Sequence, residues 1–248
     1  MSLASDIRLP AVQLVNVSMA FRGTAGVVPV LHEVSVGFSE RALTAVMGPS
    51  GSGKTTLLHC AAGLERPIGG TVFLGGTELE TGNDRELTEI RRHRVGFVFQ
   101  QFNLLPMLTV YENVALPLRL SGGRVRQPAV MEALRQVGLE DKAGQRPAQL
   151  SGGQQQRAAI ARTLVAEPEI VFADEPTGSL DRATGRQVMG LLRQVVDQAG
   201  RTVVMVTHDP VAAAYADRVI FLVDGRVIGK IDHPTVDEIV AELGRWES

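Results

Sequence analysis

A glycine-rich segment set between an apolar run and a helical pattern leaves this chain few possible architectures. The segment covers residues 48–56 and reads Gly-Pro-Ser-Gly-Ser-Gly-Lys-Thr-Thr. Residues 44–47 before it show no regular polar alternation, which is typical of a strand buried on both faces. Residues 56–62 after it have a helical pattern, and Gly63 is placed to end that helix. A strand, a glycine-rich loop and a helix in this order predict an α/β core.

The glycine-rich segment also satisfies the phosphate-loop pattern, in which glycines let successive backbone N–H groups turn toward phosphate oxygens. The dipole of the following helix adds positive potential at the same place. The Lys54 ammonium supplies a cation for the outer phosphates, and the Thr55 hydroxyl is a ligand for Mg²⁺. We therefore expect a bound nucleoside triphosphate, contacted by Gly48, Pro49, Ser50, Gly51, Ser52, Gly53, Lys54, Thr55 and Thr56.

Two adjacent carboxylates, Asp174 and Glu175, follow a second apolar run at residues 170–173. A carboxylate at the tip of a buried strand beside a phosphate loop is placed to hold the metal, directly or through water. The next carboxylate along the chain is placed to polarise the attacking water. Asp174 is therefore the candidate metal ligand, and Glu175 is the candidate general base.

A second phosphate-handling pattern occupies residues 150–157, which read Leu-Ser-Gly-Gly-Gln-Gln-Gln-Arg. Ser151 has the position of a helix N-cap, and Gln154 completes a capping-box spacing. Gly152 and Gly153 leave the start of this helix bare of side chains, and a bare helix N-terminus is an anion site. Either this is a second site in the same chain, or it completes the first site in another copy.

Chain length, charge and the distribution of apolar residues further narrow the class of protein. A chain of 248 residues is long enough for one or two globular domains, and 44% apolar residues can fill a core; we expect a single domain spanning 1–248. A net charge of −2 gives no basic excess, so no nucleic-acid partner is expected. No run approaches eighteen apolar residues and no basic-then-apolar leader is evident, so we expect neither a membrane span nor a signal peptide.

The first half of the chain changes character near residue 104. Residues 11–47 are predicted to be strands, as are 71–74 and 95–99. Residues 104–150 instead look helical, which predicts a helical subdomain inserted into the α/β core.

Local signals subdivide this helical segment. Thr109 and Glu112 have capping-box spacing and predict a helix start, and Pro117 should kink or end that helix. A second helix is predicted to begin at residues 127–129, with a proline near its first position, and to close at Gly138.

Strand and helix alternate again after the second pattern. Residues 170–173 and 203–206 are predicted to be buried strands, with a helix over residues 182–199 between them. Residues 219–228 predict a hairpin that turns at Asp224-Gly225, and residues 235–238 predict the cap of a final short helix.

With these residues in order, the chain resembles an ATP-binding-cassette (ABC) ATPase subunit over nearly its whole length. Residues 48–56 match the Walker A loop, 150–154 the family signature and 170–175 the Walker B strand with its catalytic glutamate. The remaining matches are the D-loop at Ser179, Leu180 and Asp181, the switch histidine His208, the Q-loop glutamine Gln100, and Phe21 where the family places an aromatic against adenine.

The resemblance implies a fold and its limits. It predicts an α/β P-loop NTPase core with an N-terminal antiparallel β subdomain, formed by residues 1–103 and 151–248, and a helical signature subdomain at 104–150. Spacing alone does not choose between Gln100 and Gln101 as the Q-loop glutamine, and the resemblance favours Gln100.

The resemblance also implies an ATPase whose sites are shared between two copies. ATP and Mg²⁺ are the expected ligands, with each nucleotide held between Walker A of one subunit and the signature helix of the other. The implied roles are phosphate contact for Lys54, Mg²⁺ coordination for Thr55, Gln100 and Asp174, water activation for Glu175, γ-phosphate contact for His208, trans contacts for Ser151, Gly152, Gly153 and Gln154, and coupling of the two sites for Asp181.

Residues 101–106, 108–114 and 173–178 resemble the lipoprotein-release and macrolide-export branch of the family, which implies that residues 101–120 dock a separate transmembrane permease. The implied location is the cytoplasmic face of the membrane. The branch also implies an alternative, an ATP-switched mechanical regulator of a membrane partner without solute transport. An ABC ATPase of the DNA-repair type needs a long coiled coil, and one of the translation type usually carries two cassettes; neither pattern appears in this sequence. A GTPase is disfavoured because the guanine-reading [NT]KxD element does not appear.

Overall fold

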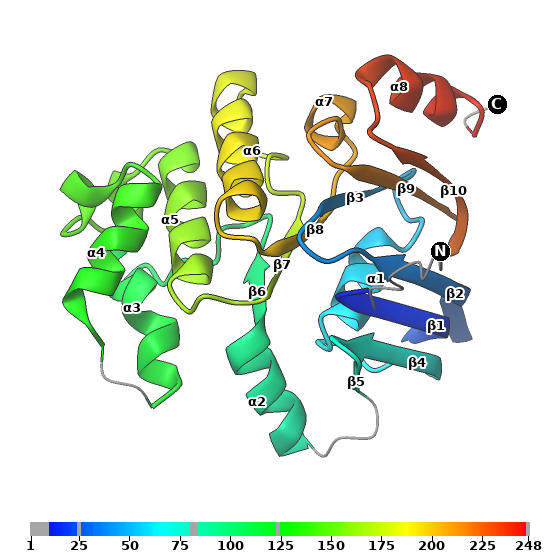
Figure 1. Ribbon diagram of the computed structural model, residues 1–248, viewed down its shortest axis with the longest axis horizontal. Coiled ribbons are helices and arrows are strands. Elements are labelled where there is room, and N and C mark those ends of the chain that lie inside the picture. Colours follow the sequence, from blue (N-terminus) through cyan, green and yellow to red (C-terminus); the bar gives the residue numbers. More distant parts are fainter. Residues whose placement is uncertain (1–9, 24–25, 80–83, 123–124, 247–248) are drawn as a thin grey trace, which may run out of the picture.

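In the computed structural model of the chain, residues 10–23, 26–79, 84–122 and 125–246 are described (Figure 1). The strands are β1 (Val12–Gly23), β2 (Gly26–Phe38), β3 (Leu43–Met47), β4 (Gly69–Leu74), β5 (Thr77–Glu78), β6 (Val95–Val98), β7 (Ile170–Asp174), β8 (Thr202–Val206), β9 (Arg218–Val223) and β10 (Arg226–Asp232). The helices are α1 (Lys54–Ala61), α2 (Asp84–Arg94), α3 (Val110–Leu120), α4 (Gln127–Gln136), η1 (Glu140–Lys142), η2 (Pro147–Gln149), α5 (Gly152–Leu164), α6 (Arg182–Asp197), α7 (Pro210–Ala213) and α8 (Val236–Gly244).

Two sheets organise these elements. The larger sheet has the order β10-β9-β3-β8-β7-β6, in which β9, β3, β8, β7 and β6 are parallel neighbours and β10 is antiparallel to β9. The smaller sheet has the order β2-β1-β4-β5 and is antiparallel throughout. The expected α/β core with an N-terminal antiparallel sheet is confirmed. Because β3, β8 and β7 are parallel neighbours, their carboxyl ends meet at one edge of the sheet.

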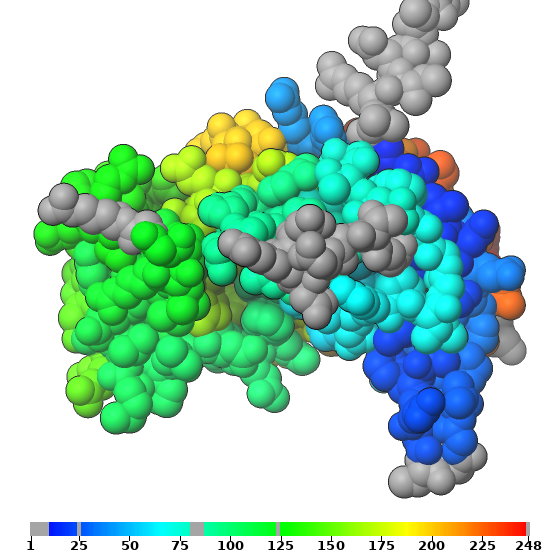
Figure 2. All heavy atoms as spheres, turned by 90° about the horizontal axis from the view of Figure 1, so that it is seen from below, coloured from blue at the N-terminus to red at the C-terminus, as the bar shows by residue number. Residues whose placement is uncertain are grey.

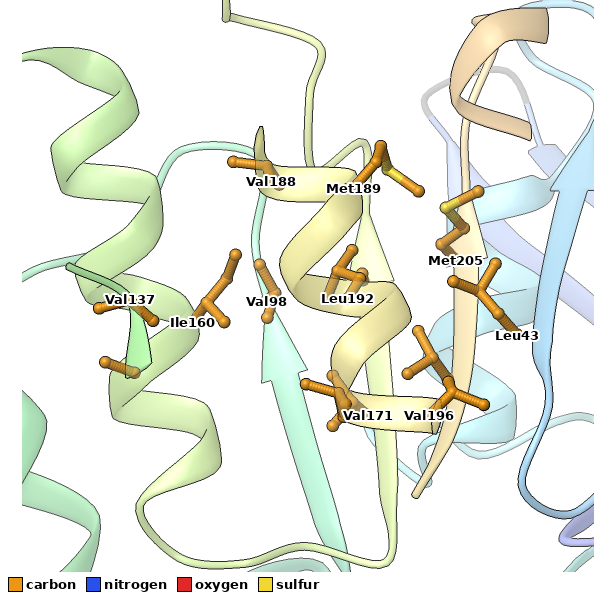
Figure 3. Close-up of a cluster of buried hydrophobic side chains, with 14 of the residues drawn as sticks. Leu43, Val98, Val137, Ile160, Val171, Val188, Met189, Leu192, Val196 and Met205 are labelled. Atoms are coloured by element: carbon orange, nitrogen blue, oxygen red, sulfur yellow. The ribbon is translucent and has the colours of Figure 1, made fainter. Parts of the chain in front are cut away.

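The central strands are buried on both faces, as their unbroken apolar sequences predicted. Along β7, Val171 and Ala173 belong to one core cluster, whereas Ile170 and Phe172 belong to the other. The first cluster fills the space between the sheet and α6 and reaches α5 (Figure 3). The second packs β7 and β8 against α1 and the small sheet. The odd and even residues of one strand therefore face different layers.

Helices α3 and α4 pack against α5 on the side of the molecule away from the small sheet (Figure 1). The Thr109 capping box opens α3 as predicted. Of the two outcomes predicted for Pro117, a kink or an end of the helix, the end does not occur, because α3 continues to Leu120. Proline removes the N–H that would bond to the Asn113 carbonyl, but that costs one bond while α3 keeps its packing on α5.

Other local predictions are confirmed, and one helix is new. The hairpin turn between β9 and β10 falls at Asp224-Gly225, where both residues have positive φ (46° and 68°), as a tight hairpin requires. Helix α2 was not predicted, because it is mostly charged and its apolar stripe consists of Leu87 and Ile90 alone. Within the part of the chain that the structure describes, no helix has the length and apolar character needed to cross a bilayer.

Candidate nucleotide-binding site

The glycine-rich loop joins the end of β3 to the start of α1, as the sequence indicated. Gly48 has φ of 154°, and a Cβ at that position would lie 1.9 Å from the carbonyl oxygen of Leu222 on β9. Any side chain there would displace a neighbouring strand, so the loop needs glycine. The Ser52 hydroxyl is buried and has no partner among the described residues, which leaves it available to a phosphate oxygen.

Lys54 folds back into this loop. Its Nζ donates to the carbonyls of Gly48 (3.0 Å) and Pro49 (2.8 Å). Burial lowers the pKa of the Lys54 ammonium, while the nearby charges of Glu175 and Asp174 raise it. The ammonium is thus held at the centre of the loop, where a phosphate would gain a cation that is only partly satisfied by carbonyls.

Asp174, at the end of β7, lies beside Thr55 in the first turn of α1. The Thr55 hydroxyl donates to Asp174 Oδ1 at 3.1 Å. Burial raises the pKa of the Asp174 carboxyl, and this outweighs the lowering caused by the Thr55 hydrogen bond and by the charges of His59 and Lys54. A hydroxyl and a carboxylate are the hard oxygen ligands that Mg²⁺ prefers, so the pair fits the predicted metal position.

Glu175 and His208 form the second pair at this edge of the sheet. His208 Nδ1 lies 2.9 Å from Glu175 Oε1. The Glu175 side chain is only 14% exposed, and its Oε2 is buried without a partner among the described residues. Glu175 also has φ of 45°, a left-handed conformation that is unusual for glutamate and that its backbone bond to the Val206 carbonyl helps to fix.

Gln100 follows β6 and reaches the same edge. Its Nε2 lies 3.4 Å from the Cβ position of Gly178, in the loop that follows Glu175. The Gln100 side chain therefore lies beside this loop, and its role as the Q-loop glutamine stays a prediction.

The signature segment begins α5 as predicted. The Ser151 hydroxyl accepts from the Gln154 N–H at 3.3 Å, and Gln154 Oε1 accepts from the Ser151 N–H at 2.9 Å. A Cβ at Gly153 would lie 2.1 Å from Thr184 Cγ2 on α6, so this glycine also permits close packing of two helices. The Cβ position of Gly152 is 3.8 Å from the Phe102 ring, which places the helix start near the end of β6.

Within one chain this helix start is distant from the phosphate loop. Strands β8 and β7 lie between β3, which leads into the loop, and β6, which leads to Phe102 beside the start of α5. Three strand spacings amount to roughly 14 Å. The two anion sites predicted from the sequence are therefore not brought together within one chain.

Asp181 caps the helix that follows the D-loop. Its Oδ1 accepts from the backbone N–H groups of Ala183 (2.9 Å) and Thr184 (3.1 Å), and its Oδ2 accepts from the Thr184 hydroxyl at 2.6 Å. The bonds from Thr184 are the largest cause of the lowered pKa of the Asp181 carboxyl. An aspartate before a helical pattern is itself an N-cap signal, so this structural role was readable from the sequence.

Phe21 lies on β1 and is 41% exposed. It pairs with Val28 on β2, in a hairpin whose far end stands out from the body in Figure 2. Val30, two residues along β2 from Val28, abuts the phosphate loop: its carbonyl oxygen is 2.9 Å from the Cβ position of Gly53. The hairpin thus carries Phe21 to the neighbourhood of the loop.

One buried contact near the site was not foreseen. Gln156, on α5, is fully buried and donates from Nε2 to the carbonyl of Pro176 at 2.8 Å. It joins the signature helix to the loop after Glu175. Its position within a run of three glutamines gave no local signal for this role.

A phosphate loop, a hydroxyl–carboxylate pair and a glutamate–histidine pair on one sheet edge define a P-loop nucleoside triphosphatase. The family model described as ABC transporter matches residues 31–178. The chain belongs to the ABC transporter family, in which it is an ATP-binding ATPase cassette.

The relatives extend over nearly the whole chain. The ABC transporter ATP-binding protein MJ0796 of Methanocaldococcus jannaschii is 44% identical over 87% of this chain and 94% of its own length. The lipoprotein-releasing system ATP-binding protein LolD of Anaeromyxobacter dehalogenans is 43% identical, with 93% and 98% covered. The macrolide export ATP-binding/permease protein MacB of Burkholderia pseudomallei is 41% identical over 92% of this chain, which spans 35% of that protein. The predicted branch is therefore confirmed.

A solved structure agrees with the fold. The dimeric structure of the MJ0796 cassette in a post-hydrolysis state, bound to ADP and Pi, matches with a TM-score of 0.84 and 41% identity, covering 90% of this chain and 99% of that one.

Proposed function

We propose that two copies of this chain close head to tail around two molecules of Mg-ATP and drive a separate transmembrane permease. The observation that carries this proposal is the separation of the phosphate loop from the signature helix, with β8 and β7 between their strands. One loop supplies only part of a cage for a triphosphate, so the bare start of α5 from a second copy completes it. The dimeric MJ0796 cassette supports this arrangement.

The proposal gives each site residue a role. Lys54 and the loop amides would bind the β- and γ-phosphates, Phe21 would contact adenine, and Thr55, Asp174 and Gln100 would hold Mg²⁺, which would neutralise phosphate charge. In the partner copy, Ser151 to Gln154 contact the γ-phosphate and Asp181 links the sites.

Glu175 is the group that activates water. Its Oε1 is engaged by His208 at 2.9 Å, whereas its buried Oε2 has no protein partner among the described residues. The Glu175 carboxylate is therefore the group that orients the attacking water and accepts its proton. His208 is 68% exposed, so it can leave Glu175 and contact the γ-phosphate without unpacking the core.

The permease contact is proposed for residues 101–120. Leu105, Met107 and Leu120 are exposed there by 45%, 77% and 69%. The names of the LolD and MacB relatives place such cassettes in export and lipoprotein-releasing systems. We place the chain at the cytoplasmic face of the membrane, held there by the permease.

A mixing experiment tests the shared site. Lys54→Ala removes the phosphate cation of one copy. Ser151→Asp keeps a good helix cap but sets a negative charge against the partner's triphosphate. If sites are shared, each variant alone is inactive and the mixture recovers ATPase activity, because a mixed dimer has one intact composite site. Ser151→Thr, which keeps a neutral cap, is the matched control and retains activity. Two folded variants that regain no activity at any mixing ratio would rule out the composite site.

A further inference from the structure

Two adjacent residues near the end of α5 hold both ends of the segment that carries Gln100. Thr163 Oγ1 lies 3.0 Å from the carbonyl of Phe97, before Gln100. Arg162 donates from Nη2 to the carbonyl of Phe102 at 2.9 Å and from Nη1 to that of Asn103 at 2.5 Å, after Gln100. All three contacts join residues about sixty positions apart in the sequence.

The backbone at the Arg162 end adopts an unusual conformation. Phe102 and Asn103 have φ of 48° and 49°, and two consecutive non-glycine residues in the left-handed region are rare. Such a conformation persists only where surrounding contacts impose it. Here the planar guanidinium, which presents paired donors in a fixed fork, engages both carbonyls at once.

Arg162 has no carboxylate partner within residues 10–23, 26–79, 84–122 and 125–246. Burial lowers the pKa of its guanidinium, so placing it here is costly. Among the described residues, its hydrogen-bond partners are the two loop carbonyls. A partly buried cation that bonds to a backbone loop, rather than to a carboxylate, indicates that the residue serves to hold the loop conformation.

We propose that Arg162 is a positioning residue for Gln100, fixing the strained turn at Phe102 and Asn103 so that Gln100 stays at the nucleotide site. This inference rests on the proposed role of Gln100. It also links Gln100 to α5, whose first residues are proposed to contact the partner copy. Gln100 and α5 would therefore move together.

Amide hydrogen exchange of the nucleotide-free chain tests whether Arg162 fixes the turn at Phe102 and Asn103, and it does not depend on ATPase activity. Arg162→Met should raise exchange in residues 97–105 about tenfold or more, since two charge-assisted bonds are lost. The matched control is Arg157→Met, which removes another α5 arginine whose bond goes to the Val137 carbonyl, and leaves residues 97–105 unchanged. Should Arg162→Met fail to fold, Arg162→Lys keeps the charge without the fork and should show the same increase. Unchanged exchange at 97–105 in a folded variant overturns the proposal.

A double-mutant cycle tests whether Arg162 acts on hydrolysis through Gln100. Arg162→Met should lower kcat about tenfold to a hundredfold by misplacing Gln100. Added to Gln100→Ala, it should cost nothing further; multiplicative losses would show independent structural damage and overturn the proposal. Wild-type hydrolysis in Gln100→Ala would also overturn it. The mixing experiment with Lys54→Ala and Ser151→Asp does not involve Gln100, so failure of the shared site is recognised separately.

Discussion

His208 Nδ1 and Glu175 Oε1 are 2.9 Å apart because their residues follow neighbouring parallel strands, β8 and β7. The two strands pair in register up to Asp174 and Val206, so the residues that come next leave the sheet side by side. This geometry brings the proposed base Glu175 and the histidine that contacts it to one point from positions thirty-three residues apart.

Replacing the base should separate binding from hydrolysis. Glu175→Gln keeps the size of the side chain but removes its basicity, so hydrolysis should fall about 10²- to 10⁴-fold. ATP binding should persist, and the variant should accumulate as a nucleotide-bound dimer. Steady-state ATPase assays and sedimentation with and without Mg-ATP check both parts. Near-normal turnover would remove Glu175 from its role.

Gly153 should be replaceable only together with Thr184. A Cβ at Gly153 would lie 2.1 Å from Thr184 Cγ2, whose side chain is held by its bond to Asp181. Gly153→Ala should therefore destabilise the chain by about 1–3 kcal/mol. Thr184→Ser removes the clashing methyl group and keeps the hydroxyl, so the double variant should recover most of the loss in urea unfolding. A double variant no more stable than Gly153→Ala would refute the packing explanation.

Asn113 should be a large contributor to the stability of the helical segment. It is fully buried; its Oδ1 accepts from the Leu105 N–H, and its Nδ2 reaches the carbonyls of Leu105, Leu108 and Thr109. Asn113→Ala should cost about 2–4 kcal/mol, because these backbone groups lose their partner. Asn113→Asp should cost more, since a carboxylate would face carbonyl oxygens. Chemical denaturation measures both, and equal stability of Asn113→Asp and wild type would contradict the hydrogen-bond network.

The capping box of α3 should make stability depend on pH. The pKa of the Glu112 carboxyl is lowered from its ordinary value of 4.5, first by the backbone and then by the side-chain hydrogen bond of Thr109. Because the folded pKa is depressed, this stabilisation is present above pH 4.5 and is lost as pH falls through the folded value. Wild type should exceed Glu112→Gln in melting temperature at neutral pH, and the difference should shrink in acid. A difference that grows in acid would contradict this sign.

The sequence predicted features with local signals and missed features that depend on distant packing. The capping boxes at Thr109, Ser151 and Thr235 and the turn at Asp224-Gly225 each lie within a few residues, so they were readable. The continuation of α3 past Pro117 depends on neighbouring helices, and α2 lacks an apolar face broad enough to recognise.

The same division holds for the candidate site. Residue types and order predicted the phosphate loop and the carboxylate pair, because each follows a buried strand. Strand order, which no local pattern encodes, decides that Glu175 meets His208 and that the signature helix lies away from the phosphate loop. Arg162 and Gln156 act across long sequence separations, so their contacts needed the fold.

The alternation of β7 between two core clusters has an evolutionary consequence. Asp174 continues the face of Ile170 and Phe172, which look toward α1 and therefore toward Thr55. Inserting or deleting a single residue in this strand would exchange its two faces and turn the carboxylate to the layer of α6. Lineages can thus vary the strand by substitution but not by length, so alignments of true functional relatives should be free of gaps between residues 170 and 175.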